Sequence, residues 1–288
     1  MTNTANTQRN NTILVIGSTG KTGKRIARRL EDLGLPVRHG SRSAQVPFDW
    51  EKPQIWAPAL AGAASVYIAY TPDLAVPGSV EAIRELTRLA IQAGVGRLVL
   101  LSGRGEEEAE RAEDVVRASG LDCTIVRATW FSQNFSEGNF LDDVIAGTVA
   151  LPVGDVREPF VDADDIADVA VAALTDDRHI GQTYELTGPR LLSFGDAVAE
   201  IAAASGRDLR FIPVPIEDYV ATLTEYEVPQ DVISLLRYLF STVLDGRNAK
   251  LADGVQRSLG REPKDFADYA RQTAATGVWT PHASSARG

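Results

Sequence analysis

Short apolar segments alternate with longer amphipathic segments along the first half of the chain. Most of the short segments are apolar runs that end at a glycine, a proline or a polar residue. Such runs are typical of strands buried on both faces of a parallel sheet. The predicted strands are residues 13–16, 37–40, 66–69, 97–102 and 124–127.

The segments between these strands carry apolar residues at helical spacing. Ile26, Leu30 and Leu33 form one such stripe, which Gly34 ends. Further helices are predicted over residues 80–91 and 106–119. Strands that alternate with helices imply parallel pairing, so the sequence predicts an α/β fold with a Rossmann-type, doubly wound parallel sheet.

The alternation of strands and helices weakens after about residue 135. Helices dominate there, so we expect a smaller, mostly helical C-terminal region that caps the substrate. These helices are predicted over residues 194–204, 217–223, 232–239 and 263–275. The predicted domains are a flexible polar arm over residues 1–12, a Rossmann domain over 13–135 to which segments near 150–190 return, and a cap over 136–288.

The most informative motif is a glycine-rich turn between the first predicted strand and the first predicted helix. It consists of Gly17, Ser18, Thr19, Gly20, Lys21, Thr22 and Gly23. In this position, backbone N–H groups can approach a pyrophosphate at the positive end of the helix, and side chains on the glycines would block that approach. The motif therefore predicts a dinucleotide-binding site.

This turn has two other interpretations. The sequence Gly20-Lys21-Thr22 is similar to the end of a nucleoside-triphosphatase P-loop, but that motif requires glycine where Val15 stands. A strand–helix turn that binds no ligand stays open, although three glycines at three-residue spacing argue against it.

The segment after the second predicted strand indicates which dinucleotide is bound. NAD-binding folds place an acid about 20 residues beyond the turn to hold the ribose 2′-hydroxyl. No acid lies between Leu33 and Phe48, where Ser41, Arg42 and Ser43 stand instead. A planar cation with two hydroxyl donors suits the 2′-phosphate of NADPH, and a solvated loop arginine is the alternative.

Composition and charge narrow the possible partners and ligands. The formal net charge is −10 and lysines and arginines do not cluster, which opposes binding to nucleic acid or an anionic membrane.

No run of 18 apolar residues and no signal peptide occur, so a cytoplasmic protein is expected. Three histidines and a single cysteine, Cys123, predict no disulfide and no metal. The acids of 162–165 are predicted to start a helix, with a metal site as the alternative.

At these residues the sequence resembles the NmrA-like group of atypical short-chain dehydrogenase/reductases, which includes NADPH-dependent quinone oxidoreductases and NADPH sensors. The order and spacing of several blocks carry the resemblance over nearly the whole chain. These blocks are residues 17–23, 61–66, 93–102, 118–127, 130–135 and 259–263.

The resemblance implies a role for individual residues. Thr19 to Thr22 would hold the pyrophosphate, Ser41 and Arg42 the 2′-phosphate, and Asp49 the adenine. Ala69, Tyr70 and Thr71 would lie beside the cofactor, and Ser102 near the nicotinamide. The segment from Trp130 to Asn134, which includes Phe131, would line the nicotinamide and substrate pocket. Strand ends are where open α/β sheets bind ligands.

One feature of the main-line short-chain dehydrogenases is missing. They protonate the substrate oxygen with a tyrosine and a lysine four residues later, and no tyrosine here has lysine at that spacing.

From these features together we expect an NADPH-dependent reductase of a conjugated carbonyl, such as a quinone or an aromatic or polycyclic ketone. Ser102 or Tyr70 would donate to the oxyanion, and Tyr70, Trp130 and Phe131 would stack on a flat small-molecule substrate. The alternative is a catalytically silent NADPH sensor that regulates a partner protein.

Overall fold

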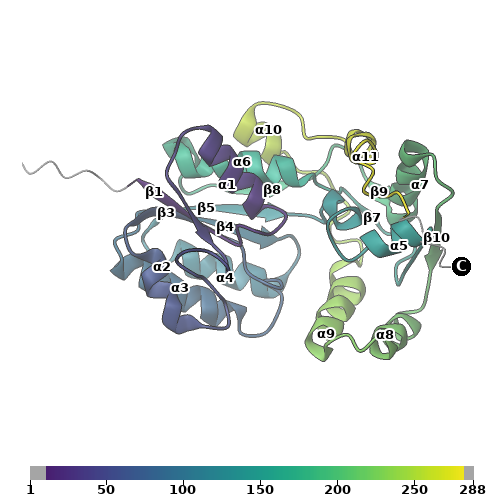
Figure 1. The fold of residues 1–288 in the computed structure, drawn as a ribbon, viewed down its shortest axis with the longest axis horizontal. Coiled ribbons are helices and arrows are strands. Elements are labelled where there is room, and N and C mark those ends of the chain that lie inside the picture. The colour runs from purple at the N-terminus through teal and green to yellow at the C-terminus, as the bar shows by residue number, and fades with distance from the viewer. Residues whose placement is uncertain (1–10, 282–288) are drawn as a thin grey trace, which may run out of the picture. The chain divides into compact units, whose positions relative to one another are not determined.

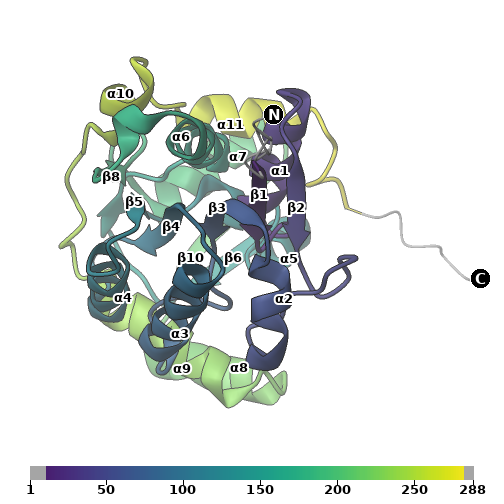
Figure 2. The same ribbon diagram turned by 90° about the vertical axis from the view of Figure 1, so that its left-hand side faces the viewer.

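The computed structural model describes residues 11–281, which form two compact units. The first unit runs to Arg127 and resumes over Ala167–Tyr184, and the second comprises Ala128–Ile166 and the residues from Glu185 onward. Most of the polar arm expected over residues 1–12 lies outside the described residues. Figure 1 and Figure 2 label the elements of both units.

A six-stranded sheet forms the centre of the first unit. Its strands are β1 (Thr12–Ile16), β2 (Val37–Gly40), β3 (Ala63–Ile68), β4 (Arg97–Gly103), β5 (Asp122–Ala128) and β8 (Thr183–Leu186). They are arranged in the order β2-β1-β3-β4-β5-β8, and β1 pairs in parallel with both β2 and β3. The chain leaves β1 toward β2 and then returns to the other side of β1, so the topological switch point lies between β1 and β3.

Helices cover both faces of this sheet (Figure 1). One face carries α1 (Gly23–Asp32) and α6 (Ala163–Thr175), and the other carries α2 (Trp56–Leu60), α3 (Ser79–Gln92) and α4 (Glu107–Arg117). Leu14 and Ile16 of β1 pack in one core cluster with Ile83 and Leu86 of α3. Because neither face is open to solvent, apolar residues can follow one another without alternation along the strands.

The second unit is mostly helical and has an aromatic core. Its helices are α5 (Leu141–Ala146), α7 (Phe194–Ser205), α8 (Ile216–Glu225), α9 (Gln230–Tyr238), α10 (Gly254–Leu259) and α11 (Phe266–Ala274), with single turns at Ser132–Phe135 and Leu239–Val243. Phe135, Phe160, Phe194 and Phe266 are fully buried there. The predicted fold class is therefore confirmed.

Two small strand pairs complete the second unit. β10 (Arg210–Pro213) pairs in parallel with β6 (Thr148–Leu151), and β7 (Arg157–Glu158) pairs antiparallel with β9 (Leu192–Ser193). Among residues 11–281, no helix combines the length and apolarity needed to cross a bilayer.

Candidate functional site

The glycine-rich turn lies at the switch point of the sheet and leaves no room for side chains at two of its glycines. Gly17 has a φ of +78°, and a Cβ on it would lie 3.1 Å from the Cβ of Ala69. A Cβ on Gly23 would lie 2.1 Å from the carbonyl oxygen of Gly17. The Gly17 N–H also donates to the Gly40 carbonyl at 2.9 Å. These contacts hold the turn between the ends of β2 and β3.

The first turn of α1 is open to an anion. Thr22 occupies the N-cap position, but its side chain does not cap the helix; its Oγ1 accepts a hydrogen bond from the Tyr67 hydroxyl at 2.8 Å. No acid lies in this first turn. Without a side-chain cap or an acid at this end of the helix, the positive end of the helix dipole favours negative charge.

Ser18 supplies a second sign of an anion site. Its side chain is only 5% exposed, and its Oγ has no hydrogen-bond partner among the described residues. A buried hydroxyl without a partner is uncommon in native proteins, since the lost hydration is not replaced. Thr19 and Gly20 are exposed. The turn therefore fits the pyrophosphate of a dinucleotide.

The loop after β2 carries the residues predicted to bind a 2′-phosphate. The Ser41 carbonyl accepts hydrogen bonds from Ala44 N at 3.2 Å and Phe48 N at 3.0 Å, which close the loop on itself. Arg42 is exposed, and its charge acts on the nearby Asp49. Gly40, which precedes this loop, accepts the hydrogen bond from the glycine-rich turn. The structure thus brings the two predicted phosphate-binding segments together.

Asp49 is held mainly by its own neighbours. Its Oδ1 accepts from Glu51 N at 3.1 Å, and Lys52 Nζ lies 3.3 Å from Oδ2. The Glu51 N–H lowers the pKa of Asp49, and Lys52 and Arg42 lower it further. Asp49 is therefore a carboxylate at neutral pH, with Arg42 close enough to act on it.

Residues after β3 are positioned by aromatic packing. Trp50 Nε1 donates to the Ala69 carbonyl at 3.1 Å, and the rings of Trp50 and Tyr70 lie 4.6 Å apart. Burial raises the pKa of Tyr70, so its hydroxyl keeps its proton at neutral pH and can donate it in a hydrogen bond. Thr71 is exposed and precedes a cis peptide bond to Pro72.

Ser102, at the end of β4, belongs to a buried ionic network. Its Oγ donates to Glu113 Oε1 at 2.6 Å, and Arg127 Nε donates to the same oxygen at 2.9 Å. Arg117 reaches the other oxygen of Glu113 at 2.7 Å. The hydroxyl proton of Ser102 is thus held in a hydrogen bond to Glu113 of α4. Glu113 is not among the residues predicted from the sequence, because only the packing of α4 on β4 brings it to Ser102.

The predicted substrate residues Trp130, Phe131 and Asn134 belong to the second unit. Trp130 is half-buried, and its ring lies 5.4 Å from Phe194 and 5.3 Å from Phe240, so it is part of the aromatic core. Phe131 forms a bridge with Val161. The neighbouring Gln133 is buried and donates to Asp162 Oδ1 at 3.0 Å. This bond fixes the segment to the start of α6.

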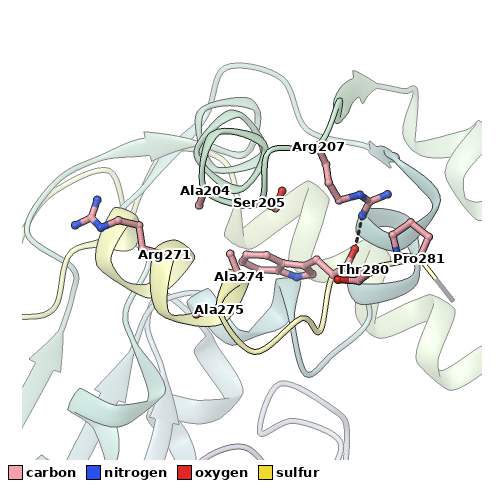
Figure 3. A pocket seen from close by; sticks show the side chains of 9 residues that line it. Ala204, Ser205, Arg207, Arg271, Ala274, Ala275, Thr280 and Pro281 are labelled. Atoms are coloured by element: carbon pink, nitrogen blue, oxygen red, sulfur yellow. Dashed lines mark hydrogen bonds between the residues drawn. The ribbon is translucent and has the colours of Figure 1, made fainter. Parts of the chain in front are cut away.

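A hollow of about 470 Å³ lies in the second unit, beside α7 and α11 (Figure 3). None of the predicted site residues lines it. The guanidinium of Arg207 is held by the carbonyls of Val144, Ile145 and Trp279 at 2.6–2.7 Å, and Arg271 is paired with Asp268. Both cations at this hollow are therefore engaged within the unit.

The parallel sheet with a glycine-rich turn at its switch point defines a protein of the Rossmann-type dinucleotide-binding class. The chain belongs to the NmrA-like family, whose model matches residues 9–270. The family resemblance drawn from the sequence is confirmed.

Known proteins resemble the chain over nearly its whole length. Agroclavine dehydrogenase of Claviceps fusiformis is 31% identical over 281 residues, which cover 90% of this chain and 96% of that protein. Prestalk A differentiation protein A of Dictyostelium discoideum is 27% identical over 278 residues, covering 91% and 92%. The NADPH complex of an NADPH-dependent quinone oxidoreductase from Escherichia coli superposes with a TM-score of 0.72 at 19% identity, covering 90% and 99%.

Proposed function

We propose that this protein is an NADPH-dependent reductase that transfers a hydride to a conjugated carbonyl, such as a quinone or an aromatic or polycyclic ketone. The observation that carries the proposal is the uncapped, acid-free start of α1 behind Gly17 and Gly23, next to a loop with an exposed arginine. A dehydrogenase among the sequence relatives and a quinone oxidoreductase of the same fold support it.

The cofactor would be held by the first unit. The backbone from Thr19 to Thr22 and the Ser18 hydroxyl would bind the pyrophosphate, because they supply donors at the positive end of α1. Ser41, Arg42 and Ser43 would bind the 2′-phosphate, where Arg42 supplies the planar cation that such a group prefers. Asp49 is proposed to contact the adenine.

The reaction proposed needs an oriented acceptor and a hydrogen-bond donor to its oxygen. When bound, NADPH supplies a hydride from its nicotinamide ring. Tyr70, held by Trp50 at the end of β3, keeps its hydroxyl proton and is our candidate hydrogen-bond donor to the developing oxyanion. Ser102 is the weaker candidate, because its proton is directed to Glu113. Trp130, Phe131 and Asn134 are assigned to substrate binding.

A catalytically silent NADPH sensor is the second candidate. The specific observation in its favour is that no tyrosine has a lysine four residues later. Tyr67, for example, has no such lysine, and its hydroxyl donates a hydrogen bond to Thr22. A sensor requires tight NADPH binding and a partner surface that responds to NADP⁺, but no turnover.

NADPH oxidation by the purified full-length protein, measured against a panel of quinones and polycyclic aromatic ketones, tests the proposal. The reductase predicts acceptor-dependent loss of NADPH absorbance, faster than with NADH at equal concentration. Tight NADPH binding with no turnover across the whole panel would reject the enzyme. Pull-down experiments with NADPH and NADP⁺ would then test the sensor.

A further inference from the structure

Two carboxyl groups lie together at the edge of the first unit where β3 and β4 end. β3 and β4 are parallel neighbours, so their carboxyl ends meet at one edge of the sheet. Asp73 follows β3 and Glu106 follows β4, and each carboxyl is close enough to act on the pKa of the other. Two carboxyl groups this close disfavour ionising together, because the negative charge of one opposes that of the other.

The surroundings of Glu106 favour the protonated form. Its side chain is only 8% exposed, and its Oε2 has no hydrogen-bond partner among the described residues. The carboxyl lies directly over Gly103, where a Cβ would be 2.1 Å from Oε2. Glu106 stands at the N-cap of α4 but does not cap it. The carboxyl therefore leaves the helix and reaches the end of β4.

The charges facing the pair act in the same direction. Burial raises the pKa of Glu106, and the negative charges of Asp73 and Glu113 raise it further. Burial also raises the pKa of Asp73. The N–H of Ala75, which donates to Asp73 Oδ1 at 2.9 Å, acts in the opposite direction and lowers this pKa. Glu113 is itself paired with Arg117 and Arg127. The two carboxyls thus titrate as one unit, and the raised pKa of each favours a proton on the pair.

We propose that the Asp73–Glu106 pair is the proton source for the reduced substrate, in place of a tyrosine–lysine pair. This inference rests on the proposed reductase function. The carbonyl carbon receives the hydride, with both its electrons, from NADPH, and the carbon–oxygen π bond breaks. The oxygen takes the proton held by the pair, which gives an alcohol and NADP⁺. The pair is left with two negative charges and takes a proton back from water.

The first test does not depend on activity. Carboxyl carbon NMR of the full-length protein, labelled at aspartate and glutamate, should show a carboxyl that stays protonated at pH 7. Its signal should be lost in Glu106→Gln and kept in the control Glu107→Gln, because Glu107 is an exposed neighbour that pairs with Arg111. A wild-type protein in which every side-chain carboxyl is ionised at pH 7 would overturn the proposal.

The second test measures turnover of an aromatic ketone, because a ketone needs a proton more than a quinone does. Glu106→Gln should lower kcat by about 10²-fold or more, while KM and the Kd for NADPH stay within about twofold. Wild-type kcat should fall as pH rises through the titration of the pair, and this dependence should disappear in the variant. Asp73→Asn and the double variant should lose no more than Glu106→Gln, because the pair acts as one unit.

The two levels of failure are distinguishable. Wild-type turnover with an unchanged kcat and pH profile in Glu106→Gln would overturn only the proton source. No wild-type turnover with any acceptor would overturn the reductase and the proton source together.

Discussion

The glycines of the turn differ in what an added side chain would meet. At Gly23 a Cβ would lie 2.1 Å from the Gly17 carbonyl oxygen and 2.9 Å from the Cα of Ser18, both backbone atoms that cannot move aside alone. At Gly20 the nearest atom is the same oxygen at 3.3 Å. Gly23 therefore serves the packing of α1 against the turn, whereas exposed Gly20 is available to serve the approach of a ligand.

We predict that Gly23→Ala destabilises the protein by about 1–3 kcal/mol through overpacking. Gly20→Val should leave the fold largely intact and abolish NADPH binding, because a branched side chain would stand where the pyrophosphate approaches. Urea unfolding and calorimetry separate the two effects. Gly154→Ala is the control, since nothing lies within 4 Å of its added Cβ. Unchanged NADPH affinity in folded Gly20→Val would contradict the assignment of this turn.

We propose that Arg42 decides between the two nicotinamide cofactors. Arg42→Ala should weaken NADPH binding roughly tenfold or more, because charge-assisted hydrogen bonds are worth about 1.5–3 kcal/mol. NADH binding should change little. Arg28→Ala removes the same charge from an exposed position on α1 and should affect neither cofactor. Equal losses for NADPH and NADH in Arg42→Ala would show that this arginine supports the loop instead.

At the scale of elements, α5 carries a carboxyl whose charge opposes folding. Burial, aided by the charge of Asp142, raises the pKa of Asp143 to about 6. The folded protein therefore holds this proton more tightly than the unfolded chain does. The resulting stability is fully present below about pH 4 and is lost as pH rises through about 6.

Asp143→Asn should remove this part of the pH dependence. The variant should be more stable than wild type by about 1 kcal/mol at pH 8, a figure reduced for the partial exposure of the carboxyl. The difference should vanish near pH 4. Urea unfolding at both pH values measures it, with the exposed Asp155→Asn as control. A variant less stable than wild type at pH 8 would contradict the prediction.

The sequence predicts long or continuously apolar elements well and short ones poorly. The run at residues 13–16 differs from β1 by a single residue, and the stripe at 80–91 lies within α3. β7 and β9 have two residues each, too few for any period, and β8 alternates in burial without an apolar run. The predicted helix over 263–275 begins only at Phe266, where Asp265 caps it by accepting from Ala267 N.

The candidate site also has a part that the sequence predicts and a part that it does not. The glycine-rich turn can be predicted because all its residues lie close together in the sequence, from Gly17 to Gly23. The partners of Ser102 and Glu106 are not local, since Glu113 reaches Ser102 through helix packing and Asp73 reaches Glu106 across neighbouring strands. In the sequence, Glu106 is one of several acids at a helix start, and only the structure shows that it is buried.

At the scale of the whole molecule, the chain returns to its first unit after building part of the second. The returning segment 167–184 closes the edge of the first unit, because Gln182 O accepts from Ile125 N at 2.9 Å and Asp168 pairs with Arg29 at 2.7 Å. Arg97, on β4, also donates to the carbonyls of Ala173 and Leu174.

A chain cut after residue 135 should therefore not fold cooperatively, because it lacks these partners and leaves β5 as an unpaired edge. Loss of a single sharp urea transition and of NADPH binding is the expected result. A fragment that keeps both would show that the returning segment is dispensable.

The most direct test of the central claim, reduction by hydride transfer, is to follow the hydride itself. NADPH deuterated at C4 of the nicotinamide, in each of its two stereochemical forms, is supplied with an aromatic ketone or quinone that the protein turns over, and mass spectrometry examines both products. We predict that deuterium leaves the cofactor from one form only, and that the alcohol from the ketone carries it on the former carbonyl carbon. Unlabelled alcohol from both forms, or NADP⁺ that keeps its deuterium in both, would contradict hydride transfer by this protein.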